Sequence, residues 1–543
     1  MAIGHEPVGG SVYSSDAEDM AHFGKRAQLK RIFGLVHVVG FTCCLVITWE
    51  AMLVLFGGGL QNGGNAGLIY GYIFVWIGTI LQVVVMAEMA SMIPLAGGQY
   101  NWVAILSPRS CSKFLSYITG WTCVIAWQCT TASSSYLAGT LIQGLLVLNY
   151  PGYEFQRWHG TLLHIAIVVV SFFVNTVTKP LLPAIELFFF GLHVTGFLAL
   201  MVPLVVMAPK ASADEVFATF YNGGGWSTDG LSFFIGLSAT MFGFIGCDAA
   251  SHLAEEIQHA STTIPRSMFA SITLNGILGL CTVIAIGFCL GSDPSSILST
   301  PTGYPLIQMF ADATSPDNEN FRAATAMCSI IILACIAATI NVLTSASRML
   351  WAFARERGLP FSSWLSRVHN GLWATTTNEN SSSSTNKHSN TVPFNAVLTS
   401  SIIASLLSLI NIGSAVAFNA FTSLVVVASF ATFILSASTL LLKRIRHRHH
   451  RHSNENDGSN DIPLGAFNLG PNATGIPIIV ASIAYSLLGA FFSLWPPAPD
   501  PKPEELNWSG VVFGGGVVWS LLYWAVWGRK VYTGPVLEIN PQR

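Results

Sequence analysis

The sequence has 543 residues, of which 52% are apolar and only 10% are charged, and its formal net charge is −2. Soluble domains carry about 25% charged residues, so this composition excludes an ordinary water-soluble fold and favours one embedded in lipid. The near-neutral net charge gives no reason to expect a nucleic-acid partner.

Apolar stretches long enough to span a bilayer, about 20 residues each, recur along the chain. After a polar tail at 1–32, five spans are predicted at 33–56, 67–89, 113–142, 160–176 and 184–207. Five more are predicted at 231–253, 267–291, 323–350, 394–411 and 414–442. A basic linker at 443–474, two last spans at 475–494 and 508–528 and a tail at 529–543 complete the chain. The expected fold is an all-α integral membrane protein of about twelve transmembrane helices.

The distribution of Lys and Arg predicts the orientation, because cytosolic loops are enriched in these residues. With the N-terminus in the cytosol, 21 of the 25 fall on the cytosolic side, and the other 4 are Arg157, Lys210, Arg322 and Lys502. Both termini are therefore expected in the cytosol. The polar, low-complexity segments 370–392 and 443–470 are expected to be disordered.

The ten cysteines lie almost entirely in apolar runs and form no CxxC motif. A disulfide framework or a metal site is therefore not expected, and no cofactor is predicted.

Two carboxylates lie deep in predicted spans: Glu50 in the first and Asp248 in the sixth. An ionisable group at membrane depth is costly, so each is a candidate functional residue. Each could instead only bond a neighbouring helix. Gly243 and Gly246 weaken the helix in the sixth span just before Asp248.

The number of spans in each half predicts an inverted repeat. If 33–207 and 231–442 are two repeats of five spans, the second enters the membrane from the opposite side. Transporters of this type bind substrate near the bilayer midplane, where two discontinuous helices meet.

Four groups of motifs carry a family resemblance. They are Thr48-Trp49-Glu50-Ala51 with Asn62-Gly63-Gly64; Ala87-Glu88-Met89 with 94–100 and Gly120-Trp121; 244–248 with Glu255-Glu256 and Ile264-Pro265-Arg266; and 345–349 with 353–356 and 358–360. Over about 33–530 the chain resembles the amino acid–polyamine–organocation superfamily, and within it the fungal amino-acid, GABA and choline permeases.

The resemblance implies a LeuT-type fold of five plus five inverted helices and two C-terminal helices, with helices 1 and 6 unwound at the substrate. It implies substrate contacts from Thr48, Trp49, Glu50 and Ala51 in helix 1 and from Phe242, Phe244, Ile245 and Gly246 in helix 6. Asp248 matches a position linked to proton coupling or gating. One departure affects where helix 1 breaks: relatives often have GxG where this chain has Thr48-Trp49-Glu50.

Other polar residues have a structural reading beside a functional one. Glu255, Glu256 and Arg266 are predicted to form a cytosolic ion-pair network, which would be either a gate or purely structural. Buried, hydrogen-bonded histidines are favoured over a proton relay at His159, His164 and His193.

Together these features predict a secondary active, proton-coupled permease for amino acids or related amines such as GABA. A choline or polyamine transporter of the same fold is the alternative, and a polytopic membrane enzyme is the alternative from another class, although no HExxH or HxxxD box is present. The predicted partners are a small amino acid or amine, a co-transported proton and the lipid bilayer. The plasma membrane is the expected location, with the vacuole or another internal membrane as the alternative.

Overall fold

The computed structural model describes residues 20, 23–25, 28–178, 181–290, 297–315, 320–370, 391–413, 417–453, 465–470, 472–496, 498–502 and 506–535. Nearly all of its regular structure is helical. The first half contains α2 (Leu35–Val46), α3 (Thr48–Gln61), α4 (Gly64–Met92), α5 (Gln99–Leu106), α6 (Ser112–Asn149), α7 (Arg157–Thr176), α8 (Leu182–Met207) and α9 (Ala213–Phe217).

The second half contains α10 (Asp229–Phe242), α11 (Ala249–His252), α12 (Ala260–Cys289), α14 (Pro305–Thr314), α15 (Arg322–Arg355), α16 (Ser362–Leu365), α17 (Phe394–Ser408), α18 (Ile410–Gly413) and α19 (Ala417–Ser453). The C-terminal helices are α20 (Asn472–Phe492), α21 (Ser509–Tyr523) and α22 (Arg529–Val531), with a π-helical turn at Trp524–Gly528. Two short antiparallel strands, β1 (His369–Asn370) and β2 (Thr391–Val392), pair with each other.

Eleven helices among the described residues are long and apolar enough to cross a membrane. The one predicted span that is not among these eleven is the sixth, 231–253. It consists of a shorter helix, α10, followed by an irregular turn and the four-residue α11. The all-α membrane fold is therefore confirmed, and the sixth span is discontinuous.

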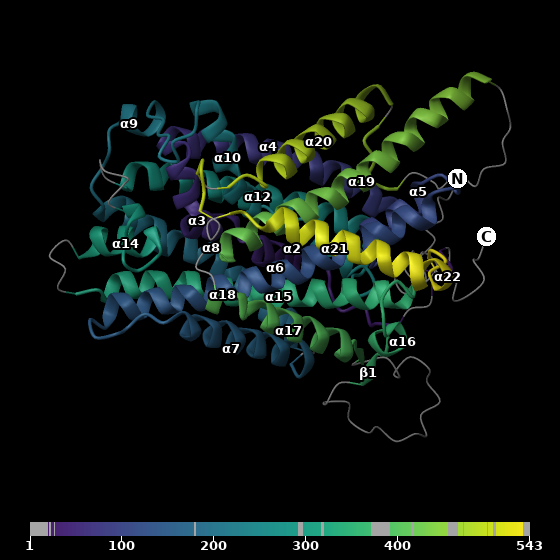
Figure 1. Cartoon of the computed structure of the whole chain (residues 1–543), viewed down its shortest axis with the longest axis horizontal. Coiled ribbons are helices and arrows are strands. Elements are labelled where there is room, and N and C mark those ends of the chain that lie inside the picture. The colour runs from purple at the N-terminus through teal and green to yellow at the C-terminus, as the bar shows by residue number, and fades with distance from the viewer. Residues whose placement is uncertain are drawn as a thin grey trace, which may run out of the picture.

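The long helices run roughly parallel in one bundle (Figure 1). α5, α16 and α22 lie at one end, and α9, α14 and α18 lie at the other. The first of these ends is called the basic end, because Lys113, Arg355 and Arg529 lie there. α15 packs along α6, α4 along α12, and α19 along both α6 and α20. Large apolar side chains such as Phe173, Phe188 and Trp519 are exposed on the flanks, as expected where lipid is the solvent.

The predicted disorder at 443–470 is wrong for part of that segment. α19 continues to Ser453, because the basic residues extend the last turns of a long helix. Residues 465–470 pack on α4, where the Phe467 N–H donates to Ser91 Oγ at 3.0 Å. Residues 454–464, and 371–390 of the other predicted segment, lie outside the described part of the chain.

Candidate functional site

The first span breaks at Ile47. This residue has φ 38° and ψ 45°, and it is the single non-helical residue between α2 and α3. The left-handed region costs a residue with a Cβ roughly 1–2 kcal/mol. Such a conformation persists only where the surroundings hold it. Thr48, Trp49 and Glu50, where the family comparison put the break, instead form the first turn of α3.

Asn275 of α12 holds the two sides of this break together. Its Oδ1 accepts a hydrogen bond from the Thr48 N–H at 3.0 Å, and its Nδ2 donates to the Cys43 carbonyl at 3.4 Å. The side chain is completely buried. Sequence reasoning did not select Asn275, and its only signal is a lone amide within an apolar span.

The sixth span breaks between Phe242 and Ala249. Gly246 has φ +94°, and a Cβ placed there would lie 2.3 Å from Leu45 Cδ2 of α2. A Cβ on Gly243 would lie 2.6 Å from Met52 Cε of α3. Glycine is favoured at Gly246 by its positive φ, whereas at Gly243 the close contact is with the flexible end of Met52, and both contacts show that the two broken helices touch. The structure thus brings the predicted break in helix 1 (α2 and α3) against that in helix 6 (α10 and α11).

The predicted substrate-binding residues divide between opposite faces of this contact. Ala51 faces Gly243, and its Cβ would be 3.5 Å from a Cβ on that glycine. Of the two aromatic candidates, Phe244 is buried against Tyr72 of α4, with ring centroids 5.3 Å apart. Phe242 is only half-buried, and Ile245 is buried within the turn.

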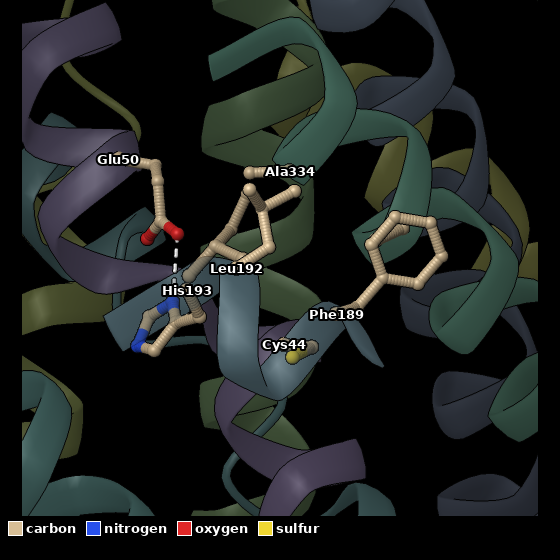
Figure 2. A pocket seen from close by; sticks show the side chains of 8 residues that line it. Cys44, Glu50, Phe189, Leu192, His193 and Ala334 are labelled. Atoms are coloured by element: carbon tan, nitrogen blue, oxygen red, sulfur yellow. Dashed lines mark hydrogen bonds and ion pairs between the residues drawn. The ribbon is translucent and has the colours of Figure 1, made fainter. Parts of the chain in front are cut away.

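Trp49 and Glu50 point toward α8 instead. Glu50 Oε1 lies 2.7 Å from His193 Nδ1 (Figure 2). The Trp49 indole N–H donates to that same nitrogen at 3.2 Å. The Trp49 ring also packs edge-on against Phe197, at 5.5 Å between centroids. His193 was predicted as a buried, hydrogen-bonded histidine, but its pairing with Glu50 was not foreseen, because 143 residues separate the two.

Asp248 lies at the end of the helix 6 turn and is buried. Its Oδ2 accepts a hydrogen bond from Gln99 Nε2 of α5 and lies 3.5 Å from His252 Nε2. His252 Nδ1 donates to the Ala96 carbonyl at 3.2 Å, and the ring packs edge-on against Trp127. Asp248 therefore ties the helix 6 turn to the start of α5, and His252 ties it to the loop before α5. Gln99 belongs to one of the family motifs, whereas nothing singled out His252.

The predicted ion-pair network at the basic end forms with different arginines. Glu256 Oε1 accepts from Arg348 Nε at 2.9 Å, and Glu255 Oε1 accepts from Arg355 Nη1 at 2.6 Å. Arg266 is exposed and has no ion-pair partner among the described residues, so its predicted place in the network is wrong. Arg348 and Arg355 project from α15, which crosses the bundle beside the helix 6 turn.

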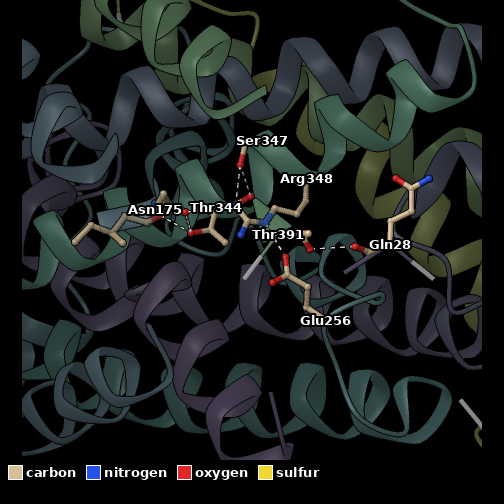
Figure 3. Close-up of polar contacts among 8 residues, drawn as sticks. Gln28, Asn175, Glu256, Thr344, Ser347, Arg348 and Thr391 are labelled. Carbon is tan, nitrogen blue, oxygen red and sulfur yellow. Dashed lines mark hydrogen bonds and ion pairs between the residues drawn. The ribbon is translucent and has the colours of Figure 1, made fainter. Parts of the chain in front are cut away.

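Arg348 is the centre of a buried polar cluster (Figure 3). Its Nη1 donates to Ser347 Oγ at 3.2 Å and to Asn175 Oδ1 at 3.5 Å. Asn175 Oδ1 also accepts from Thr344 Oγ1 at 2.6 Å. The cluster therefore joins α7, α15 and the segment after α11 at the basic end.

The chain just before α2 covers this cluster. The Ile32 and Phe33 amides donate to the Glu256 carbonyl at 2.9 and 3.1 Å, and the Phe33 carbonyl accepts from the Gln258 N–H at 3.0 Å. Lys25 is buried in an ion pair with Glu356. Part of the predicted cytosolic tail is thus packed into the basic end of the bundle.

The fold and this geometry define a polytopic membrane transporter in which two discontinuous helices meet inside the bundle. A family model described as amino acid permease matches residues 33–518, and the chain belongs to this family. The predicted resemblance is therefore confirmed, and the chain is a transporter rather than an enzyme.

Individual relatives agree with this assignment. A protein of Macrophomina phaseolina named as an amino acid/polyamine transporter is 29% identical over 75% of this chain and 85% of its own length. A choline transporter of Saccharomyces cerevisiae is 26% identical over 93% of this chain and 83% of its own. An amino-acid permease of Arabidopsis thaliana is 25% identical over 99% of this chain and all of its own.

Proposed function

We propose that this protein is a secondary active, proton-coupled permease for amino acids or related amines such as GABA. The observation that carries the proposal is the direct contact between the breaks of helix 1 and helix 6. Such a contact exposes backbone groups inside the bundle that no helix can satisfy, and a polar solute is able to bond them there. Residues 33–207 and 231–442 are the two proposed inverted repeats.

The substrate is proposed to lie beside the contact between Ala51 and the Gly243–Gly246 turn. The Trp49 and Glu50 backbone amides are in the first turn of α3, where they have no acceptor within the helix. They form part of the positive end of the helix dipole. They suit a carboxylate. The half-buried ring of Phe242 suits a cationic amine, which an aromatic face attracts.

Asp248 and the Glu256–Arg348 pair are proposed as gating elements on the way to the basic end. Lys and Arg dominate that end, so we place it in the cytosol. The plasma membrane is the proposed location. Asp248 would have to release Gln99 when the helix 6 turn moves. Asp248→Asn is expected to slow uptake, since an amide oxygen accepts the Gln99 N–H more weakly than a carboxylate does.

The decisive experiment is uptake of labelled GABA by permease-deficient yeast that expresses this chain, with and without a protonophore. Unlabelled amino acids, choline and spermidine serve as competitors, because relatives are named for amino acids, polyamines and choline. Saturable uptake that the protonophore abolishes supports the proposal. If only choline or spermidine inhibits the uptake, the substrate belongs to that class instead. If the protonophore leaves the uptake unchanged, proton coupling is refuted.

A further inference from the structure

The contact between α3 and α8 contains a buried acid–base pair that substrate binding does not explain. Glu50 is completely buried, and His193 is 3% exposed. Glu50 Oε1 lies 2.7 Å from His193 Nδ1 (Figure 2), and the Trp49 indole nitrogen lies 3.2 Å from the same atom. Two polar side chains therefore meet at a single ring nitrogen.

Hydrogen-bond chemistry requires a proton between the acid and the base. An indole N–H only donates, and an ionised carboxylate only accepts. If Nδ1 is unprotonated, an ionised carboxylate 2.7 Å away would face its lone pair, so Glu50 would then carry a proton and donate it to Nδ1, whose single lone pair is no longer available to Trp49. If Nδ1 carries the proton instead, it donates to Glu50 and the Trp49 N–H loses its acceptor. In both arrangements one proton lies between Glu50 and His193, across the 2.7 Å contact.

The surroundings also favour a proton that stays within the pair. The titratable groups nearest to it are the thiols of Cys43, Cys44 and Cys335 and, beside Cys44, the carboxyl of Glu186 on α8. Within the described residues His193 is the only ion-pair partner of Glu50. Loss of the proton leaves a negative charge buried at membrane depth, which is costly without a cation.

A small cavity adjoins the pair. It is lined by Cys44, Ile47, Glu50, Phe189, Leu192, His193, Ala334 and Ala337, and offers about 10 Å³ to the centre of a water molecule. That volume is about the least that holds one water, and it is far too small for an amino acid. Glu50 Oε2 and His193 Nε2 are buried without a hydrogen-bond partner among the described residues. A water in this cavity would supply one and would carry a proton to or from the pair.

We propose that Glu50 and His193 form the binding site of the transported proton, and that Glu50 does not hold the amine of the substrate. This inference deepens the proposed function and rests on it. The proton joins α3, the outer half of broken helix 1, to α8. Its release toward the basic end separates the pair and frees α3 to move relative to α8.

The first test is the pH dependence of labelled GABA uptake into liposomes that contain the purified protein. Wild-type uptake should fall as the external pH rises, by up to about tenfold per unit above the titration midpoint, as for any single-proton step. Glu50→Gln mimics the protonated acid, because its amide can donate to His193 Nδ1. It should exchange GABA at equilibrium, without pH dependence and without concentrative accumulation. His193→Gln should lose the pH dependence as well.

Glu186→Gln is the matched control. Glu186 is a buried carboxyl on α8, the helix that contains His193, and it accepts a hydrogen bond from Asn341 Nδ2 at 2.8 Å. It should keep the wild-type pH slope. The proposal is overturned if Glu50→Gln and His193→Gln keep that slope, or if only Asp248→Asn loses it. It is equally overturned if Glu50→Gln weakens cationic competitors more than neutral ones.

A measurement without substrate separates this inference from the proposed function. The infrared difference spectrum between acid and alkaline pH should contain a protonated-carboxyl band that disappears in Glu50→Gln and persists in Glu186→Gln. If the wild type transports none of the tested amines but shows this band, the proposed function fails and the proton site stands. If GABA is transported but no band depends on Glu50, the proton site fails alone.

Discussion

The buried pair of Glu256 and Arg348 offers the sharpest test of how the basic end closes. Both side chains are about 1% exposed, and Arg348 donates to Glu256, Ser347 and Asn175. Arg348→Met removes a buried cation that donates to the Glu256 carboxylate, a loss worth up to roughly 3–5 kcal/mol. Only the closed arrangement bears this cost, because opening exposes the carboxylate to water.

The lower figure corresponds to a shift of about 150-fold toward the open arrangement, at 1.4 kcal/mol per factor of ten. The assay is the rate at which a membrane-impermeant thiol reagent modifies Ala51→Cys in a background whose native cysteines are replaced by serine. Reagent is applied from the basic end and, separately, from the opposite end. Arg348→Met should accelerate modification from the basic end and slow it from the other.

Two further variants isolate the cause. Arg266→Met removes a cation at the same end that is exposed and has no ion-pair partner among the described residues, so it should change neither rate. Arg348→Met combined with Glu256→Gln removes both charges and should return the rates most of the way to wild type. If Arg348→Met behaves like Arg266→Met, the pair does not hold this end closed.

Two other predictions concern the breaks themselves. Gly246→Ala adds a Cβ 2.3 Å from Leu45 Cδ2 at a residue with φ +94°, so it should abolish uptake while surface expression persists. Adding Leu45→Ala should restore only part of the uptake, because the backbone strain of about 1–3 kcal/mol at residue 246 remains. Asn275→Ala removes the acceptor of the buried Thr48 N–H, so the thermal midpoint of the purified protein should fall, in line with a cost of about 1–3 kcal/mol, whereas Asn275→Asp keeps that acceptor and should fall less.

The spans could be predicted from the sequence because apolarity over about 20 residues is a local property. The helix 6 break was also visible locally, since Gly243 and Gly246 weaken a helix wherever they occur. The helix 1 break at Ile47 was not, because a β-branched residue disfavours the left-handed conformation that Ile47 adopts. It is held by Asn275, which lies more than 220 residues further along the chain.

The polar pairs show the same limit. Arg266 is the nearest arginine to Glu256 in the family motif, yet Arg348, 92 residues away, is its partner. His193 and Glu50 are equally remote. Partner choice follows from which helices pack together, and neither spacing nor residue type contains that information.

The geometry of the first turn of α3 explains why the side chains of one family motif, Thr48-Trp49-Glu50-Ala51, contact two different parts of the bundle. Successive residues in a helix are about 100° apart, so one pair of adjacent residues and the next pair point, on average, to opposite sides. Ala51 and Met52 therefore face the helix 6 turn, whereas Trp49 and Glu50 face α8. On the proposed scheme the substrate and the proton bind opposite sides of one short, rigid turn. The substrate and the proton do not have to touch each other, because the binding of each changes the free energy of the same displacement of α3. Two ligands that favour the same displacement are coupled through it.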